Sequence, residues 1–280
     1  MQARLVVSVS HSSHPQLASH RIHGKPVLPM ALVLEWFARL VRALSPRSDS
    51  IQLRDFHIVR GVTLERFEDT GDRFALWAVA GRKGLQLELR DAEGARALRY
   101  SALVEAGPDL ASAAPLSARD LGVSPWTRPD FYTPDTLFHG PHFHVLRSIA
   151  GYAEGGARAT LAGVAAMGWP AEPWATDAAA VDGALQLAIL CALPSTGPTL
   201  PLRIARIGLA GGVARGAVHC ELQVRETSPE RVVSDITLTG SDGHRLADLV
   251  GVEMYQLPGG SAAPSRGAAS GAGSASVVPA

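Results

Sequence analysis

The sequence predicts an α+β protein built from two halves that follow the same plan. Each half contains one long apolar segment that is typical of a buried helix. Each half also contains several short segments rich in Val, Leu, Ile, Phe and Tyr, separated by turn residues such as Gly and Asp. One buried helix with several antiparallel strands, found twice, favours two sheets that each bury a helix on one face. An internal structural duplication is the economical explanation of this plan.

The helix of the first half is predicted within residues 26–44. Glu35, Arg39 and Arg42 stand at i, i+4 and i+7, so they form a narrow polar stripe on a helix that is otherwise apolar. Pro29 suits the first turn of a helix. We therefore expect this helix to be nearly buried. The strands predicted to follow it cover residues 51–65, 73–81, 85–91 and 96–106.

The second half repeats the pattern around a helix predicted at residues 181–193. Two strand candidates, residues 143–152 and 157–164, precede this helix. Four further candidates follow it, at residues 200–211, 216–226, 232–242 and 244–257.

Breaks in the apolar pattern divide the chain into four regions. Pro, Gly, Ser and Ala replace patterned residues near the middle of the chain and again at its end. The final region buries too little apolar surface to offset its ordering entropy, so a flexible linker or free tail is expected there. A linker in this position suggests a piece of a longer protein. The predicted regions are a first half at 1–107, a linker at 108–125, a second half at 126–257, and a Gly/Ala/Ser/Pro linker or tail at 258–280.

Composition limits the classes of partner. The chain is 46% hydrophobic and 19% charged, and its 26 basic residues balance 26 acidic ones. Nucleic acids and anionic membranes attract clustered excess cations, so neither is an expected partner. A small or carrier-borne molecule is expected instead.

The sequence also favours a cytoplasmic protein. Cys191 and Cys220 cannot make a disulfide framework, which favours a reducing compartment. The first residues lack the apolar core of a signal peptide, and no stretch approaches the roughly 18 apolar residues of a membrane span.

The first chemistry-bearing stretch is residues 20–29. It begins at His20 and ends where the first predicted helix begins. Gly24, Pro26 and Pro29 force a fixed turn that would hold His20 against the start of the helix. A lone histidine is more often structural or solvated than catalytic, so both interpretations stay open at this point.

The second stretch is Asp182 to Gln186, which opens the other predicted helix. The two side chains lie one helical turn apart, so the carboxamide can orient the carboxylate by hydrogen bonding. Asp182 could instead be an ordinary helix N-cap. A cap does not explain Gln186, because capping requires no amide one turn further into a buried helix.

Together these two stretches resemble the double-hotdog dehydratase domains of polyketide synthases and polyunsaturated fatty acid synthases. The resemblance rests on His, three residues, Gly, four residues, Pro in one half and on Asp, three residues, Gln in the other. Other landmarks occur in the family's order and extend the resemblance over about residues 10–257. They are His-Pro-Gln-Leu at 14–17, Pro-Val-Leu-Pro-Met-Ala-Leu-Val-Leu-Glu-Trp at 26–36, Phe-His-Gly-Pro-His-Phe at 138–143 and Leu-Pro-Leu at 200–202.

The resemblance implies two hotdog folds, each a long central helix wrapped by an antiparallel sheet, with His20 as general base and Asp182 as general acid. Dehydration of a 3-hydroxyacyl thioester needs a base for the C2 proton and an acid for the departing C3 hydroxyl. A helix N-terminus favours the carboxylate anion, whereas an apolar tunnel favours the neutral acid. The sequence leaves this conflict open.

Further roles follow from the same resemblance. A backbone N–H near Gly24 is expected to donate to the substrate carbonyl. Pro29, Gln186 and His139 are expected to support and orient the reacting groups. The expected residues of the substrate tunnel are Leu28, Gly140, Pro141 and Phe143.

The resemblance implies no cofactor, because the substrate travels on the phosphopantetheine arm of an acyl carrier protein. The carrier and neighbouring synthase domains are the expected partners. A homodimer is compatible with this plan, although two hotdogs in one chain no longer need dimerisation to complete a site.

The chain departs from the family pattern at its Gly-Pro motif. Many polyketide dehydratases have two tyrosines just before it, whereas this chain has Leu137 and His139 there, and His144 where Gln is common. Two interpretations stay open: a tyrosine that helps hold the substrate hydroxyl is missing, or His139 replaces it. The Phe-His-Gly-Pro form resembles dehydratases of polyunsaturated fatty acid synthases.

A metal site is not expected from the sequence. His139, His142 and His144 form one group, and a second group lies in residues 11–23, but no Cys or acidic ligand is interleaved with either. The glycines of residues 208–216 do not match a dinucleotide fingerprint, and no motif nominates a serine nucleophile.

Alternative functions remain within the same pattern. They are a domain that templates cyclisation of a poly-β-keto chain, a dehydratase that also shifts the double bond, and a non-catalytic acyl-binding module. Loss of the His or the Asp would mark the last of these, and this chain keeps both. A hotdog thioesterase would release a free acid instead.

Overall fold

The computed structural model describes residues 2–46, 50–82, 84–105, 121–126, 131–133 and 136–257. Within these residues the α-helices are α1 (Met30–Leu44) and α2 (Ala178–Thr196), and the short 3-10 helices are η1 (Pro15–Ser19) and η3 (Pro141–Phe143). The strands before α2 are β1 (Gln2–Val9), β2 (Arg21–Ile22), β3 (Lys25–Pro26), β4 (Ile51–Ile58), β5 (Asp72–Gly81), β6 (Gly84–Asp91), β7 (Leu98–Val104), β8 (Leu146–Ala153) and β9 (Gly156–Ala162). Those after α2 are β10 (Thr199–Leu209), β11 (Ala217–Thr227), β12 (Arg231–Gly240) and β13 (Arg245–Gln256).

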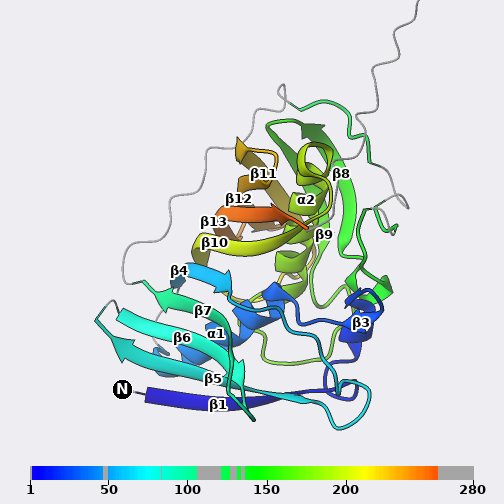
Figure 1. Ribbon diagram of the computed structural model, residues 1–280. Coiled ribbons are helices and arrows are strands. Elements are labelled where there is room, and N and C mark those ends of the chain that lie inside the picture. The colour runs from blue at the N-terminus through cyan, green and yellow to red at the C-terminus, as the bar shows by residue number, and fades with distance from the viewer. Residues whose placement is uncertain are drawn as a thin grey trace, which may run out of the picture.

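Eleven strands form one continuous sheet in the described residues, in the order β1-β5-β6-β7-β4-β10-β13-β12-β11-β9-β8. All of its pairings are antiparallel, as the sequence predicts. The halves join where β4 pairs with β10, from Ile51 opposite Leu209 to His57 opposite Arg203. Figure 1 shows the two halves stacked, with α1 against the strands of one and α2 against those of the other.

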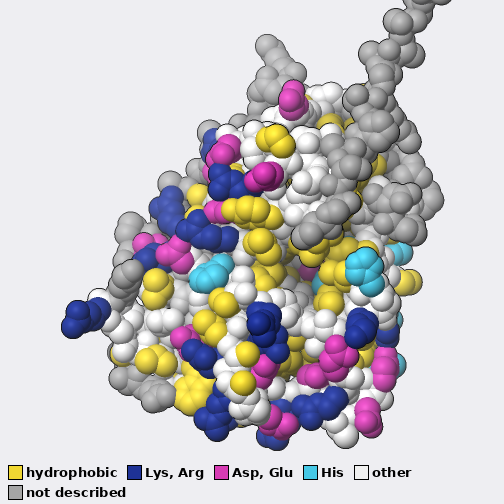
Figure 2. Space-filling view, in the orientation of Figure 1, with side chains coloured by type: hydrophobic (Ala, Val, Ile, Leu, Met, Phe, Trp, Pro, Cys, Tyr) yellow, Lys and Arg dark blue, Asp and Glu magenta, His cyan; other side chains and the backbone are white. Residues whose placement is uncertain are grey.

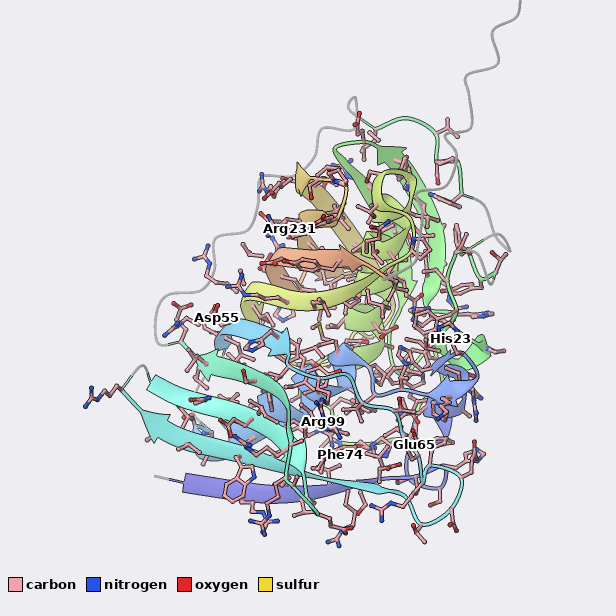
Figure 3. The ribbon with its side chains drawn as sticks, in the orientation of Figure 1. His23, Asp55, Glu65, Phe74, Arg99 and Arg231 are labelled. Carbon is pink, nitrogen blue, oxygen red and sulfur yellow. The ribbon has the colours of Figure 1, made fainter. Side chains whose placement is uncertain are left out.

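Charged side chains also cross the junction of the halves. Arg203 on β10 donates to Asp55 on β4 at 2.5 Å and to Glu253 on β13 at 2.7 Å. Figure 3 shows Asp55 at the end of the first-half sheet that faces the second half. Basic and acidic side chains are interspersed over the face seen in Figure 2, in keeping with the zero net charge.

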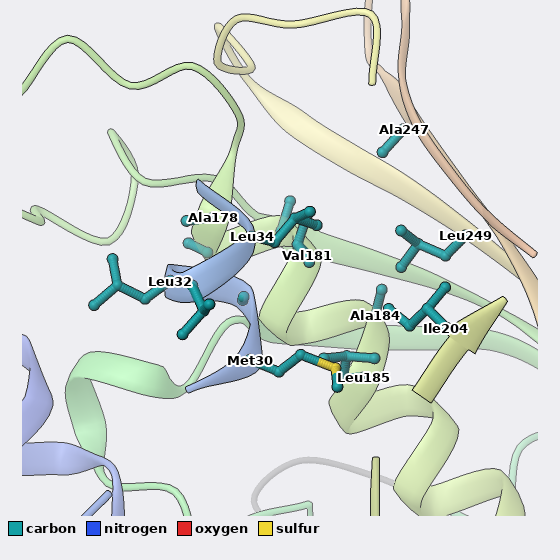
Figure 4. Packing of buried hydrophobic residues seen from close by; sticks show 14 of the residues in the cluster. Met30, Leu32, Leu34, Ala178, Val181, Ala184, Leu185, Ile204, Ala247 and Leu249 are labelled. Carbon is teal, nitrogen blue, oxygen red and sulfur yellow. The ribbon is translucent and has the colours of Figure 1, made fainter. Parts of the chain in front are cut away.

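Helix α1 begins where the sequence predicts. Pro29 occupies the position before the first helical residue, where its missing N–H leaves no intrahelical hydrogen bond unmade. Every side chain from Met30 to Ala38 is buried, including the carboxylate of Glu35. At its start α1 packs against α2, and Figure 4 shows Met30 beside Leu185.

Helix α2 begins earlier than predicted, which corrects the expectation that Asp182 opens it. Asp177 is the N-cap, and its carboxylate accepts the N–H of Ala180 at 3.0 Å. The same carboxylate accepts the N–H groups of Val164 and Ala214, each at 3.0 Å. The alternative that Asp182 is an N-cap is therefore wrong, because Asp182 lies in the second turn.

The expectation that no segment is apolar enough to span a bilayer also needs correction. Helix α2 has 19 residues and a mean hydropathy of 1.5 in its most apolar window, and 83% of that window is buried inside the protein. A core helix covered on all sides has this composition, because each of its faces meets apolar neighbours.

The strand predictions differ from the structure mainly at the chain start. Strand β1 was not predicted, because its apolar residues lack clean alternation, and as an edge strand it leaves Leu5 and Val6 exposed. The first half comprises β1 to β7 with α1, and the second comprises β8 to β13 with α2. Most of the predicted 108–125 linker and all of the 258–280 tail lie outside the described residues.

Candidate active site

His20 is held by the hairpin that follows it. The N–H of Val27 donates to the His20 carbonyl oxygen at 2.9 Å, and His20 Nδ1 lies 2.9 Å from the Val27 carbonyl oxygen. A carbonyl oxygen can only accept, so Nδ1 carries the proton and Nε2 keeps its lone pair. The hairpin turn contains His23 and Gly24, both with positive φ, and His23 is labelled in Figure 3. This geometry leaves Nε2 available as a proton acceptor.

The surroundings of His20 keep it neutral. Its ring packs against Phe143 at 4.9 Å and Phe138 at 5.3 Å between centroids. Burial lowers the pKa of His20 to about 4, although the hydrogen bond to Val27 opposes the shift. At neutral pH the imidazole is therefore an uncharged base.

Asp182 has the opposite shift. Gln186 Nε2 donates to Asp182 Oδ2 at 2.7 Å, as the one-turn spacing predicts. Burial raises the pKa of Asp182 to about 7, and the Gln186 hydrogen bond only partly offsets that rise. The influence of a helix N-terminus falls off after the first turn, so the apolar surroundings decide the conflict that the sequence left open.

Gln186 is fixed at both ends of its amide. Nε2 also donates to the carbonyl oxygen of Phe143 at 2.9 Å, and Oε1 accepts from the Tyr132 hydroxyl at 2.9 Å. The Tyr132 hydroxyl in turn accepts the N–H of Leu146 at 2.8 Å. Tyr132 is a positioning residue that the sequence analysis missed, because only the folded chain brings it to α2, 54 positions away.

His139 joins the pair from the Phe-His-Gly-Pro segment. Its Nε2 lies 3.8 Å from Asp182 Oδ2, and its ring centroid lies 5.2 Å from that of His20. One side-chain atom from each of His20, His139 and Asp182 lies within 4.8 Å of the other two. Burial, followed by the nearby His20, lowers the pKa of His139 well below its usual value. His144 Nε2–H donates to the His139 carbonyl oxygen at 3.0 Å.

The side chains of His20, His139 and Asp182 line one apolar cavity of about 350 Å³ between the halves. Apolar residues from both α1 and α2 contribute to its wall, as the predicted placement of His and Asp in different halves requires. The predicted residues Leu28, Pro29, His139 and Gln186 all line it. The other lining residues are His20, Ile22, Val27, Met30, Ile58, Gly61, Val62, Thr63, Tyr100, Phe138, Asp182, Leu185, Ile189, Leu200, Pro201 and Leu202.

Three predicted tunnel residues do not line this cavity, which is a correction. Gly140 rests on η1, where its N–H donates to the Ser19 carbonyl oxygen at 2.7 Å and an added Cβ would lie 3.1 Å from the Ser19 side chain. Pro141 begins η3, and Phe143 is fully buried behind the His20 ring. These residues place His139 and Gln186 rather than contacting the space where a substrate would lie.

The structure also does not support Gly24 as the source of the backbone N–H that donates to the substrate carbonyl. It lies in the exposed hairpin turn and is absent from the cavity wall. The first turn of α1 lies closer to the chemistry, because Met30 is part of the wall and the first N–H groups of a helix have no intrahelical partner.

The fold and the paired groups define a double hotdog with a shared His/Asp site. Three solved structures have the same fold: the dehydratase domain from the CurJ module of the curacin polyketide synthase, an N-terminal dehydratase from the difficidin assembly line, and the dehydratase domain of a mycocerosic acid synthase-like polyketide synthase. They have TM-scores of 0.71, 0.74 and 0.67 at 14%, 17% and 19% identity. The matches cover 91%, 92% and 91% of this chain and 92%, 94% and 91% of the respective structures.

Family models identify the chain more closely. The model described as the polyketide synthase dehydratase N-terminal domain matches residues 113–264, and that described as the polyketide synthase dehydratase domain matches residues 2–91. No curated protein sequence matches the chain. The chain belongs to the polyketide synthase dehydratase family, whose domains are hydro-lyases.

Proposed function

We propose that this domain removes water from a 3-hydroxyacyl chain on an acyl carrier protein and yields the 2-enoyl thioester. The observation that carries the proposal is a neutral His20 and a protonatable Asp182 with their side-chain atoms within 4.8 Å, facing one apolar cavity. Opposite pKa shifts in two neighbouring groups are typical of an acid and base pair. The host synthase is a polyketide or polyunsaturated fatty acid synthase.

The proposed step transfers one proton to the enzyme and one from it. His20 Nε2 takes a proton from C2, and the electron pair of that C–H bond forms the C2–C3 double bond as the C3–O bond breaks. Asp182 donates its proton to the leaving hydroxyl, which departs as water. A proton returning from His20 to Asp182 restores both groups, over a separation of at most 4.8 Å.

Two further groups are proposed to position the substrate. His139 lies beside Asp182, where a side-chain N–H can hold the C3 hydroxyl against the acid. The first-turn N–H groups of α1 around Met30 can donate to the thioester carbonyl, whose oxygen gains charge as the C2 proton leaves.

The partners and compartment follow from the same proposal. A phosphopantetheine arm would deliver the substrate from a carrier protein, with neighbouring synthase domains in the same assembly, in the cytoplasm. The chemistry assigned to His20 and Asp182 requires no cofactor. A carrier tethered nearby sets a high local concentration, so delivery does not depend on long-range charge attraction.

The test is mass spectrometry of a carrier loaded with 3-hydroxyacyl chains of several lengths, incubated with the wild-type domain and its variants. His20→Ala and Asp182→Asn are expected to abolish the loss of water from the carrier-bound chain. His142→Ala is the matched control, because the His142 side chain is exposed and outside the cavity wall. Retained turnover in both site variants would refute the assignment.

A further inference from the structure

The imidazole of His139 is buried without a hydrogen bond. Its side chain is 3% exposed, and Nδ1 has no partner among the described residues. Nε2 lies 3.8 Å from Asp182 Oδ2, beyond hydrogen-bonding distance. Buried polar groups in proteins are nearly always satisfied, so a buried imidazole left free beside a carboxylate indicates a site for a ligand.

The groups around His139 are those of a three-ligand metal site. His20, His139 and Asp182 each offer one ligand atom within 4.8 Å of the others, and two imidazoles with one carboxylate are a common ligand set for zinc. In a tetrahedral site with bonds of about 2.0–2.1 Å, ligand atoms lie roughly 3.3–3.5 Å apart. The His139 to Asp182 separation of 3.8 Å is already near that value.

Two of the three ligands also have the outer partners that metal ligands need. His20 Nδ1–H donates to the Val27 carbonyl oxygen, which directs the Nε2 lone pair away from that contact. Gln186 Nε2 donates to Asp182 Oδ2, the same oxygen that lies 3.8 Å from His139 Nε2, and so it orients the carboxylate beside that imidazole. The cavity of about 350 Å³ that all three residues line has space for a fourth ligand.

We propose that His20, His139 and Asp182 bind Zn²⁺ at the floor of the cavity and that this ion reversibly inhibits the domain. Inhibition rests on the function proposed above, because the ion would take up the His20 lone pair and the Asp182 carboxylate that the reaction uses. Zinc would therefore compete with the acyl substrate. Mg²⁺ would not substitute, since it prefers oxygen ligands in octahedral geometry.

Metal binding is measured first without any activity readout. The intact domain is titrated with Co²⁺, whose visible absorption reports a four-coordinate site, and with Zn²⁺ by calorimetry and by displacement of Co²⁺. Wild type is expected to bind one ion. His139→Phe keeps an aromatic ring against Phe138, which stacks on His139 at 4.1 Å, but removes a ligand. It is expected to weaken binding at least on the order of 100-fold, because loss of an outer partner alone weakens metal sites by 10- to 100-fold.

Two other variants make the comparison specific. His142→Phe, the matched control, removes an exposed histidine three positions away and is expected to bind Zn²⁺ as wild type does. Asp182→Asn removes a ligand from a different element, so a folding defect confined to His139→Phe would not decide the result. Circular dichroism checks the fold of each variant. Absence of binding by wild type, or equal binding by His139→Phe, Asp182→Asn and wild type, would overturn the site.

Inhibition is then measured by turnover of a carrier-bound 3-hydroxyacyl chain with Zn²⁺, with Mg²⁺, and with Zn²⁺ followed by EDTA. Zinc alone is expected to inhibit, with KM rising and kcat unchanged, and EDTA is expected to reverse the effect. Full turnover with the site occupied by zinc would overturn the inhibitory role. If wild type binds zinc but dehydrates no substrate, the proposed function fails while the metal site stands.

Discussion

Glu35 and Thr176 are joined by two hydrogen bonds across the two halves of the protein. The backbone N–H and the hydroxyl of Thr176 each donate to Glu35 Oε2 at 2.7 Å. The other oxygen accepts the N–H of Ala175 at 2.8 Å and Arg39 Nε at 2.5 Å. This carboxylate on α1 therefore fixes the segment that leads into α2. The His20 side of the site is tied to the Asp182 side through it.

Glu35→Ala is expected to destabilise the domain by about 3–5 kcal/mol, because it leaves buried N–H groups without an acceptor and a partly buried Arg39 with one partner fewer. Denaturant unfolding followed by circular dichroism measures the change. Glu172→Gln is the matched control, since Glu172 pairs with the same Arg39 at 2.7 Å but is 25% exposed. Its loss should stay below about 1 kcal/mol. Equal losses in the two variants would contradict the role assigned to Glu35.

The rate of dehydration is expected to fall as the pH rises above about 7. Burial raises the pKa of Asp182 to about 7, and the reaction needs its protonated form. On the acid side, the rate should hold until His20 is protonated near pH 4, where burial has placed its pKa. A pH profile of kcat/KM on a carrier-bound 3-hydroxyacyl chain tests both limbs, because that ratio reports the pKa values of the free enzyme. A rate that rises through pH 7 to 9 would exclude Asp182 as the acid.

Gln186→Leu is expected to move the alkaline limb of that profile to higher pH. The hydrogen bond from Gln186 stabilises the Asp182 anion and so lowers its pKa, and removing the bond raises the pKa. The same change lowers kcat, because the carboxyl is no longer oriented. A purely structural role for Gln186 predicts a lower kcat with the alkaline limb unmoved, so the position of the limb decides between them.

Tyr132→Phe is expected to lower kcat about fivefold, with a smaller effect on KM. It removes the hydroxyl that holds Gln186 Oε1, and one such bond contributes about 1 kcal/mol. Tyr152→Phe is the matched control, because Tyr152 lies on β8 and does not line the cavity. Steady-state kinetics of both variants gives the comparison. A change in KM alone would mean that Tyr132 acts on substrate binding instead.

The sequence predicts the α+β plan because both central helices stand out as long apolar segments and most strands as short apolar segments between turn residues. Local patterns also place His20 and the Asp182–Gln186 pair, since both depend on spacings of a few residues. The pattern could not show which oxygen atoms or N–H groups meet between distant segments. Glu35 looked like one member of a polar stripe, yet it accepts the backbone N–H groups of Ala175 and Thr176, which follow 140 and 141 residues later.

The sequence pattern also could not show the cavity or the proposed ion site, because residues far apart in the chain form both. Gly140 and Phe143 belong to a motif that the resemblance places near the substrate, but the structure uses them to position neighbours. His20 and His139 stand in two separate histidine groups of the sequence, neither with an interleaved acidic ligand. Folding brings one member of each group together with Asp182, and no spacing rule along the chain can anticipate such a set.

Asp182→Asn is expected to make the folded domain more stable at pH 8 while abolishing activity. Burial raises the pKa of Asp182 to about 7, whereas the same group in the unfolded chain has its ordinary pKa of 3.8. Between these values the folded state holds a proton that the unfolded state has lost, so wild-type stability falls as the pH rises from about 4 to 7. Above pH 7 the full penalty of a buried anion is present, and it amounts to at most about 4 kcal/mol.

Asn carries no charge at any pH and can still accept the Gln186 N–H. Denaturant unfolding at pH 5 and pH 8 should therefore show similar stabilities for the two proteins at the lower pH and a more stable variant at the higher one. A variant that is less stable at both pH values would show that the Asp182 carboxylate is favourably solvated in the folded protein.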